Sequence, residues 1–248
     1  MIEYYHKASE QQKTILHLMA LAYFPLEEDI LKACLEKTSS LFETEKDLFK
    51  SPKDINVRQL LHGLRNKVLF SSYSDEIPRN LIHFLTLEAL KNSLAAQLIK
   101  ALQDVSHSYF EKKGFETKGH TSERFFKKYY TASDQLKHKK LLDLRLALYR
   151  GIEKPLLSLA LSFSSEDLNT FLGTLFLEEP LEMDWLKTRP TIAQHIIFDM
   201  KFFSFVLNGV LVEEVSSLLA YYLPLRETKG YEGFNDTLLT YDILSGNL

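Results

Sequence analysis

Apolar residues recur three and four positions apart along most of the chain, which is the period of a helix with one buried side. The first stretch repeats at Ile15, Leu18, Met19 and Ala22 and predicts a helix from about residue 9 to 23. The same period predicts further helices at 26–37, 56–67, 87–110, 122–133, 134–152, 154–163, 164–179, 191–209, 212–226 and 235–245. The pattern therefore favours a mainly α protein.

Short local signals place two of the helix starts. Ser9 is followed three positions later by Gln12, the spacing of a capping box, in which each side chain satisfies a backbone N–H of the other residue. Asn56 stands directly before an apolar stripe and is a residue type that caps helix starts. We expect helices to begin at both positions.

The pattern changes between residues 68 and 86. Segment 68–73 is β-branched and aromatic, 75–80 is turn-like, and 81–86 alternates apolar and polar residues, which predicts two short strands joined by a loop. Three helices followed by a two-stranded wing is the order of a winged-helix domain, here 1–86. A connecting helix at 87–111 would lead to an all-α domain at 112–248.

The second domain is expected to be a stack of antiparallel helices. Helices and loops alternate about every twenty residues, which is compatible with helical-hairpin repeats, although no fixed-period signature is present. The glycine-containing segment 112–123 marks the boundary before this domain.

The first 86 residues show a characteristic order of apolar positions. These positions are Leu26, Ile30, Leu31, Leu60, Leu61, Leu64, Val68, Leu69, Phe70, His83, Phe84 and Leu85. Their order resembles the winged-helix segment of the signal-transduction ATPases with numerous domains, the class that includes the bacterial maltose regulator. The resemblance implies a winged helix that packs within the protein ahead of a helical-repeat region. No nucleotide-binding domain precedes it here, so the ATPase activity is not implied.

Composition narrows the class of protein. The 248 residues are 45% hydrophobic and 25% charged, as in ordinary globular domains. A single cysteine, Cys34, excludes an internal disulfide and a cysteine zinc site, and it is expected to be buried. The N-terminus lacks the pattern of a secretory signal, which favours the cytoplasm, and Asp199 and Lys201 interrupt the longest apolar window, which argues against a membrane span.

Motifs for catalysis, metals and cofactors are missing from the sequence. It contains no P-loop, no Gly-x-Gly-x-x-Gly, no Gly-x-Ser-x-Gly, no His-Glu-x-x-His and no His-x-His. We also expect no histidine with an acid at ligand spacing. The sequence therefore predicts no catalytic residues, no metal and no cofactor, and it disfavours an enzyme. A protein-interaction scaffold is the favoured function. Such a scaffold could be the N-terminal region of a larger regulator, which would have the same sequence features.

Nucleic-acid binding is the alternative function. The net charge of −3 gives no global attraction to phosphate, but the window 111–140 carries nine basic residues against four acidic ones. Phe125, Phe126, Tyr129 and Tyr130 alternate with its lysines and would either stack on bases or join the core. The helix at 56–67 would serve as the recognition helix. The candidate contacts are Arg58, Gln59, Arg65, Lys67, Arg124, Lys127, Lys128, Lys137, Lys139 and Lys140.

Large apolar residues are concentrated in the C-terminal half. They exceed what one buried face per helix needs, so they would either fill the core or form a groove for a protein partner. The only tryptophan stands in segment 180–190, which has a proline at each end and is expected to be irregular. The candidate partner-binding residues are Trp185, Phe202, Phe203, Tyr221 and Tyr222.

Overall fold

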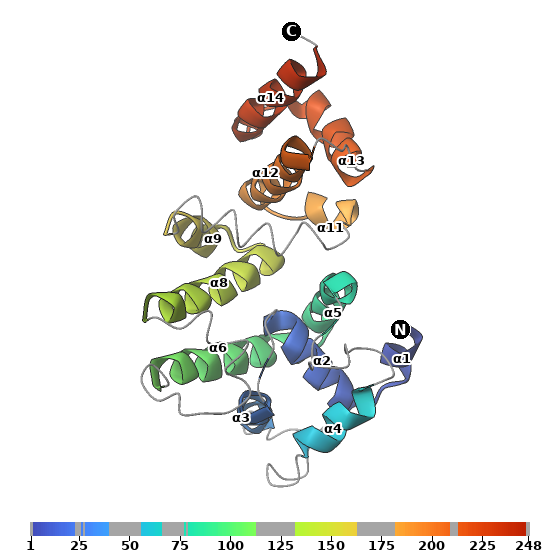
Figure 1. Ribbon diagram of the computed structural model, residues 1–248, viewed down its shortest axis with the longest axis vertical. Coiled ribbons are helices and arrows are strands. Elements are labelled where there is room, and N and C mark those ends of the chain that lie inside the picture. Colours follow the sequence, from blue (N-terminus) through green and yellow to red (C-terminus); the bar gives the residue numbers. More distant parts are fainter. Residues whose placement is uncertain are drawn as a thin grey trace. The chain divides into compact units, whose positions relative to one another are not determined.

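Helices dominate the computed structural model, which describes residues 2–22, 26, 28–39, 56–65, 77, 79–112, 132–162, 182–208 and 213–246 (Figure 1). No strand occurs in these ranges, so the mainly α class is confirmed for them. The chain divides into two units, Met1–Leu146 and Ala147–Leu248, and the boundary falls within helix α8 (Ala132–Arg150).

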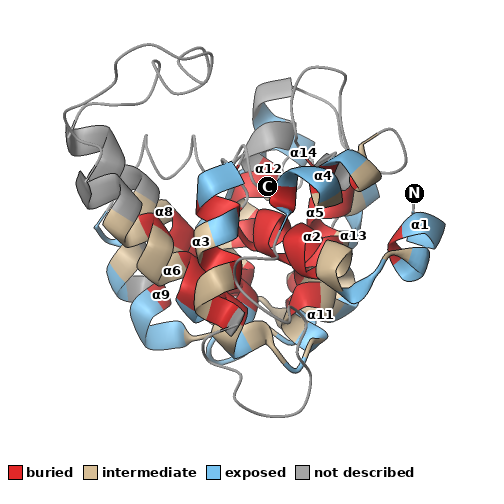
Figure 2. Cartoon of the chain, turned by 90° about the horizontal axis from the view of Figure 1, so that it is seen from below, coloured by how far each residue is buried: buried red, intermediate tan, exposed pale blue. Residues whose placement is uncertain are grey.

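The first unit is built around α2 (Glu10–Ala22). Every residue of α2 from Thr14 to Ala22 is buried, and Figure 2 shows this helix red along most of its length. A helix that is apolar on all sides needs neighbours on all sides. They are α3 (Glu28–Ser39), α4 (Val57–Leu64), α5 (Arg79–Lys91) and α6 (Ala95–Lys112), and α3 also packs along α6.

Local capping agrees with the sequence. The backbone N–H of Gln12 donates to Ser9 Oγ at 3.2 Å and that of Ser9 donates to Gln12 Oε1 at 3.1 Å, which confirms the capping box. The N–H of Gln59 donates to Asn56 Oδ1 at 2.9 Å, which confirms the second cap. Cys34 is fully buried, as expected.

The second predicted strand is wrong. Residues 81–86 lie inside α5, where Leu81, Ile82, Leu85 and Ala89 are buried at spacings of one, three and four. A short apolar run does not reveal its period by itself, and here the helical spacing extends beyond the run to Ala89. The first predicted strand, 68–73, lies outside the described residues.

The single connecting helix predicted at 87–110 is also wrong. The chain forms two helices there, because α5 ends at Lys91 and α6 begins at Ala95. Asn92 makes the break: its Oδ1 accepts a hydrogen bond from the N–H of Leu94 at 2.9 Å, a local bond that favours a turn over a helix. The helix α1 (Ile2–Lys7) was not predicted at all.

A buried arginine joins three helices of the first unit. The Arg145 side chain from α8 is 1% exposed, and its Nη2 donates to the Ala20 carbonyl at 3.0 Å and to Thr86 Oγ1 at 2.9 Å. The Ala20 carbonyl belongs to the last turn of α2 and has no partner within that helix. Arg145 therefore satisfies one carbonyl at the end of α2, which Thr86 Oγ1 also reaches at 3.2 Å, and ties α2 to α5 and α8.

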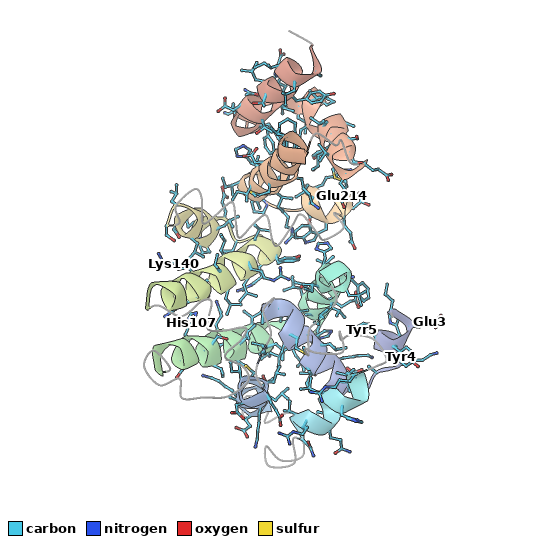
Figure 3. All side chains as sticks on the ribbon, viewed as in Figure 1. Glu3, Tyr4, Tyr5, His107, Lys140 and Glu214 are labelled. Carbon is cyan, nitrogen blue, oxygen red and sulfur yellow. The ribbon has the colours of Figure 1, made fainter. Side chains whose placement is uncertain are left out.

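α1 is attached through a tyrosine–histidine pair. Tyr5 Oη lies 2.9 Å from His17 Nε2, and the Tyr5 ring packs edge-on against Phe84 with centroids 5.5 Å apart. Figure 3 labels Tyr5 on α1. Burial lowers the pKa of His17 to about 4 and raises the pKa of Tyr5 to about 12. Both groups are therefore neutral in the folded protein at pH 7.

The second unit contains α9 (Glu153–Ala160), α11 (Met183–Lys187), α12 (Thr191–Asn208), α13 (Glu213–Tyr222), α14 (Asn235–Ser245) and the 3-10 turns η2 (Leu223–Leu225) and η3 (Glu232–Phe234). α12 packs against α9 and α13. Segment 180–190, predicted to be irregular, contains helix α11 instead, whose Leu186 is buried and so anchors the turn.

The carbonyls at the end of α8 accept hydrogen bonds from the backbone and from one side chain. The N–H of Ile152 bonds to the Ala147 carbonyl and the N–H of Gly151 to the Leu148 carbonyl, with Gly151 at φ 67°, a Schellman motif. Arg189 Nη1 donates to the Tyr149 carbonyl at 2.5 Å. The carbonyls of Ala147, Leu148 and Tyr149 in the last turn of α8 are thereby satisfied.

Replacing Arg145 by alanine is expected to lower the free energy of unfolding by about 3 kcal/mol, because it removes charge-assisted hydrogen bonds from a buried helix end. Arg145→Lys should recover only part of this loss, since an ammonium lacks the fork of the guanidinium. Urea denaturation measures both, with Arg150→Ala, an exposed position on α8, as the control. Equal stability of the Arg145→Ala and Arg150→Ala proteins would contradict the assignment.

Acid should destabilise the protein through His17. Between pH 6.5 and pH 4 the unfolded chain protonates His17 and the folded chain does not, so this contribution is complete above pH 6.5 and is lost as the pH falls toward 4. The lowered pKa corresponds to at most about 3 kcal/mol. Urea midpoints at pH 7, 5.5 and 4 should fall less steeply in His17→Gln than in the exposed control His62→Gln. Parallel profiles for the two variants would rule out His17 as the source.

Candidate interaction site

The C-terminal helices of the second unit present the clearest candidate site. Its base is an aromatic stack: the rings of Tyr222 and Phe234 are parallel with centroids 4.3 Å apart, and Phe198 stacks on Tyr222 at 5.0 Å. Tyr222 Oη donates to Gln194 Oε1 at 2.9 Å, and Gln194 Nε2 donates to the Arg189 carbonyl at 2.7 Å. The stack joins α12, α13 and η3, and its buried polar atoms are paired.

A polar clamp fixes α14 on α12. The Thr237 hydroxyl of α14 donates to Asp199 Oδ1, and His195 Nε2 lies 3.1 Å from Asp199 Oδ2. Burial raises the pKa of the Asp199 carboxyl, and the Asp236 carboxylate adds to the rise, whereas the Thr237 hydrogen bond and the charge of His195 oppose it. The clamp begins at the first turn of α14.

An ion pair holds the other end of the same helix. Arg226 Nη1 lies 2.7 Å from Asp242 Oδ2, whose side chain is only 14% exposed. With Leu238 fully buried and Phe202 packed edge-on against Tyr241, this pair completes the inner face of α14. The helix is therefore attached along its length.

The opposite side of α14 is apolar and exposed. Leu239, Ile243 and Leu244 are 45%, 59% and 55% exposed, and Asp236 and Thr240 share their side of the helix at three- and four-residue spacing. We call these five residues the α14 outer face. By contrast, the exposed residues of the neighbouring α13 are glutamate, serine and alanine (Glu213, Ser216, Ser217 and Ala220).

The histidine, aspartate and threonine of the clamp do not form a nucleophile. Both Thr237 and His195 face the same carboxylate, so the hydroxyl proton goes to Asp199 and no imidazole stands beside the hydroxyl to act as its base. No group of three or more histidine, cysteine, aspartate or glutamate side chains able to hold a metal ion occurs in the described part of the chain. The clamp positions a helix.

The prediction that no histidine has an acid at ligand spacing is wrong for His195 and Asp199. His195 and Asp199 are four residues apart on one helix, so the spacing of a histidine with a nearby acid is present, contrary to the expectation. Helical spacing alone was the signal that would have found them. Thr237 is 38 residues away from Asp199 and carried no such signal.

The predicted partner-binding residues take different places. Phe202 and Tyr222 are buried at 3% and 1% exposure, inside the aromatic core. Tyr221 is half-buried under Lys187, whose Nζ lies 5.1 Å from the ring centroid. Trp185 is half-buried between Tyr149 and Arg189. The side chain of Phe203 lies outside the described residues.

The predicted nucleic-acid residues are only partly described. Arg58 and Gln59 are exposed on α4 and Arg65 follows it, half-buried. The Arg58 guanidinium lies 3.2 Å from the Glu28 carboxylate. Lys139 and Lys140 are half-buried on α8, with Lys140 marked in Figure 3. Lys67, Arg124, Lys127, Lys128 and the side chain of Lys137 lie outside the described residues, as do Phe125, Phe126, Tyr129 and Tyr130.

The sequence contains part of the information that predicts the α14 outer face. Segment 235–245 has apolar residues on two sides of a helix, and one side suffices for packing on a core. Which side becomes exposed depends on the clamp, because Thr237 must face Asp199 of α12 for its hydrogen bond to form, and Leu238 is then buried. Sequence alone did not identify Leu239, Ile243 or Leu244.

Comparison with known proteins gives no match: no protein-family model, no curated protein and no solved structure resembles this chain at a significant level. The resemblance to the winged-helix segment of the signal-transduction ATPases therefore stays a prediction. No helix in the described ranges is long and apolar enough to cross a membrane.

Loss of the clamp should loosen α14. Thr237→Val removes a hydrogen bond to a partly exposed carboxylate, and we expect the free energy of opening of α14 to fall by about 1 kcal/mol. Hydrogen exchange followed by mass spectrometry on peptides covering 235–245 measures it. The control is Thr240→Val, because the Thr240 hydroxyl bonds only within its own helix, to the Asp236 carbonyl at 2.8 Å. Equal exchange in the two variants would show that the clamp does not hold the helix.

Proposed function

We propose that this chain is a protein-interaction module without catalysis of its own and that the α14 outer face is its docking surface. The observation that carries the proposal is the exposure of three large apolar side chains, Leu239, Ile243 and Leu244, on one side of a single clamped helix. Exposed apolar groups cost free energy in water, and a contiguous set of them on a folded protein typically marks a contact surface.

The side-chain contacts at both ends of α14 support the same proposal. A docking helix that is already ordered loses little conformational entropy when a partner binds, so more of the contact energy appears as affinity. The Asp199–Thr237 clamp and the Arg226–Asp242 pair supply this order at the two ends of the helix. The surface is thus preorganised.

Nucleic-acid binding is less well supported by the described residues. Arg58, the exposed cation of α4, already faces the Glu28 carboxylate, which places a negative charge where a phosphate would approach. The remaining basic positions of the alternative lie largely outside the described residues. We therefore place the contact surface on α14.

Site-specific photocrosslinking in cells tests the docking surface. With p-benzoylphenylalanine in place of Ile243 or Leu239, we expect discrete adducts between this chain and another protein, because exposed apolar anchors lie against the bound partner. The same group in place of Lys154, an exposed residue of α9, is the control and should give none. Leu239→Asp should reduce the adduct formed from position 243.

Other results of this experiment contradict the proposal in different ways. Equal adducts at 154 and 243 would mean nonspecific contact. No protein adduct at 239 or 243 would remove the docking surface. The same group in place of Arg58 tests the alternative: adducts from position 58 that disappear after nuclease treatment, with none at 243, would favour the nucleic-acid function.

A further inference from the structure

The charged residues at the start of the α14 outer face are all negative. Asp236 is exposed in the first turn of α14, and no ion pair of its carboxylate occurs among the described residues. Its charge reaches Asp199, whose pKa it helps to raise, and Glu232 is exposed on the preceding turn η3. Helix α14 contains no lysine or arginine, and its other acid, Asp242, is paired with Arg226 on the inner side. Asp236 and Glu232 therefore place negative charge at the N-terminal end of the apolar stripe.

The backbone of α14 restricts the kind of partner that fits. Its N–H and C=O groups are used within the helix, so it offers no edge to which an extended peptide could add hydrogen bonds. A partner that is itself a helix arrives with its backbone bonds already made. Asp236, Leu239, Thr240, Ile243 and Leu244 span about 12 Å of helix, which a partner matches with apolar residues three and four apart.

Charge argues against a second copy of α14 as the partner. The second copy's α14 contains no lysine or arginine, so it would offer no cation to Asp236. A helix with lysines or arginines beside its apolar stripe would instead place a cation against Asp236 and gain electrostatic complementarity. The outer face selects for that composition.

We propose that the α14 outer face binds a basic amphipathic helix of a partner protein. This inference rests on the proposed function and adds the chemistry of the partner. Leu239, Ile243 and Leu244 take the apolar anchors of that helix, and Asp236 together with Glu232 contacts its basic flank.

Two designed helical peptides test the inference by fluorescence anisotropy with the full chain. They share an apolar stripe of leucines at helical spacing and differ only in flanking lysines or flanking glutamates. We expect the lysine peptide to bind about tenfold more tightly at low salt, with the difference shrinking as salt is raised. Ile243→Asp should abolish binding of the lysine peptide.

Asp236→Lys should remove the preference between the peptides. The matched control is Glu153→Lys, which makes the same charge change at an exposed acid in the first turn of α9 and should keep the preference. Circular dichroism melting of each variant shows that a loss of binding is not a loss of folding.

The outcomes separate this inference from the proposed function. Equal binding of both peptides, lost in Ile243→Asp, would overturn the basic partner and leave the docking surface standing. Binding of neither peptide, with protein adducts still formed from position 243, would also overturn it and retain the proposed function. Adducts of twice the chain's mass would identify a second copy as the partner and overturn it as well. No binding and no adducts would overturn both.

Discussion

The last carbonyl groups of a helix have no partner within the helix, and one that is kept away from water must find a partner elsewhere in the protein. Two arginines meet that constraint. Arg145 reaches the Ala20 carbonyl at the end of α2, and Arg189 reaches the Tyr149 carbonyl at the end of α8. A guanidinium suits both places, because its positive charge also interacts favourably with the negative end of a helix dipole.

These contacts explain how short helices hold together in each unit. α2 is surrounded on all sides, so its last turn could not be exposed to water without uncovering the core. In the second unit, Gly151 reverses the chain after α8 with a positive φ, and Pro190 lies so close that a Cβ at Gly151 would stand 3.2 Å from its Cδ. The turn at Gly151 and the Arg189–Pro190 segment that contacts the end of α8 are therefore packed closely together.

Polar contacts on the inner side of α14 also determine the position of the proposed docking surface. On the inner side of α14, Asp199 contacts Thr237 and His195. Farther along the same side, Asp242 pairs with Arg226. Leu238 fills the remaining inner position, so Leu239, Ile243 and Leu244 are left outside. A helix with two apolar sides can bury only one on its own unit, and the clamp decides which side that is.

The sequence by itself determined the helical class, the starts at Ser9 and Asn56 and the burial of Cys34. Capping bonds and the 3.6-residue period act over three or four positions, so a short window of sequence contains them whole. Only the tertiary structure decided that Arg145 is buried and that α14 faces outward with Leu239 and Ile243. Those outcomes depend on partners such as Ala20 and Asp199, which lie 125 and 38 residues from Arg145 and Thr237 and leave no local pattern.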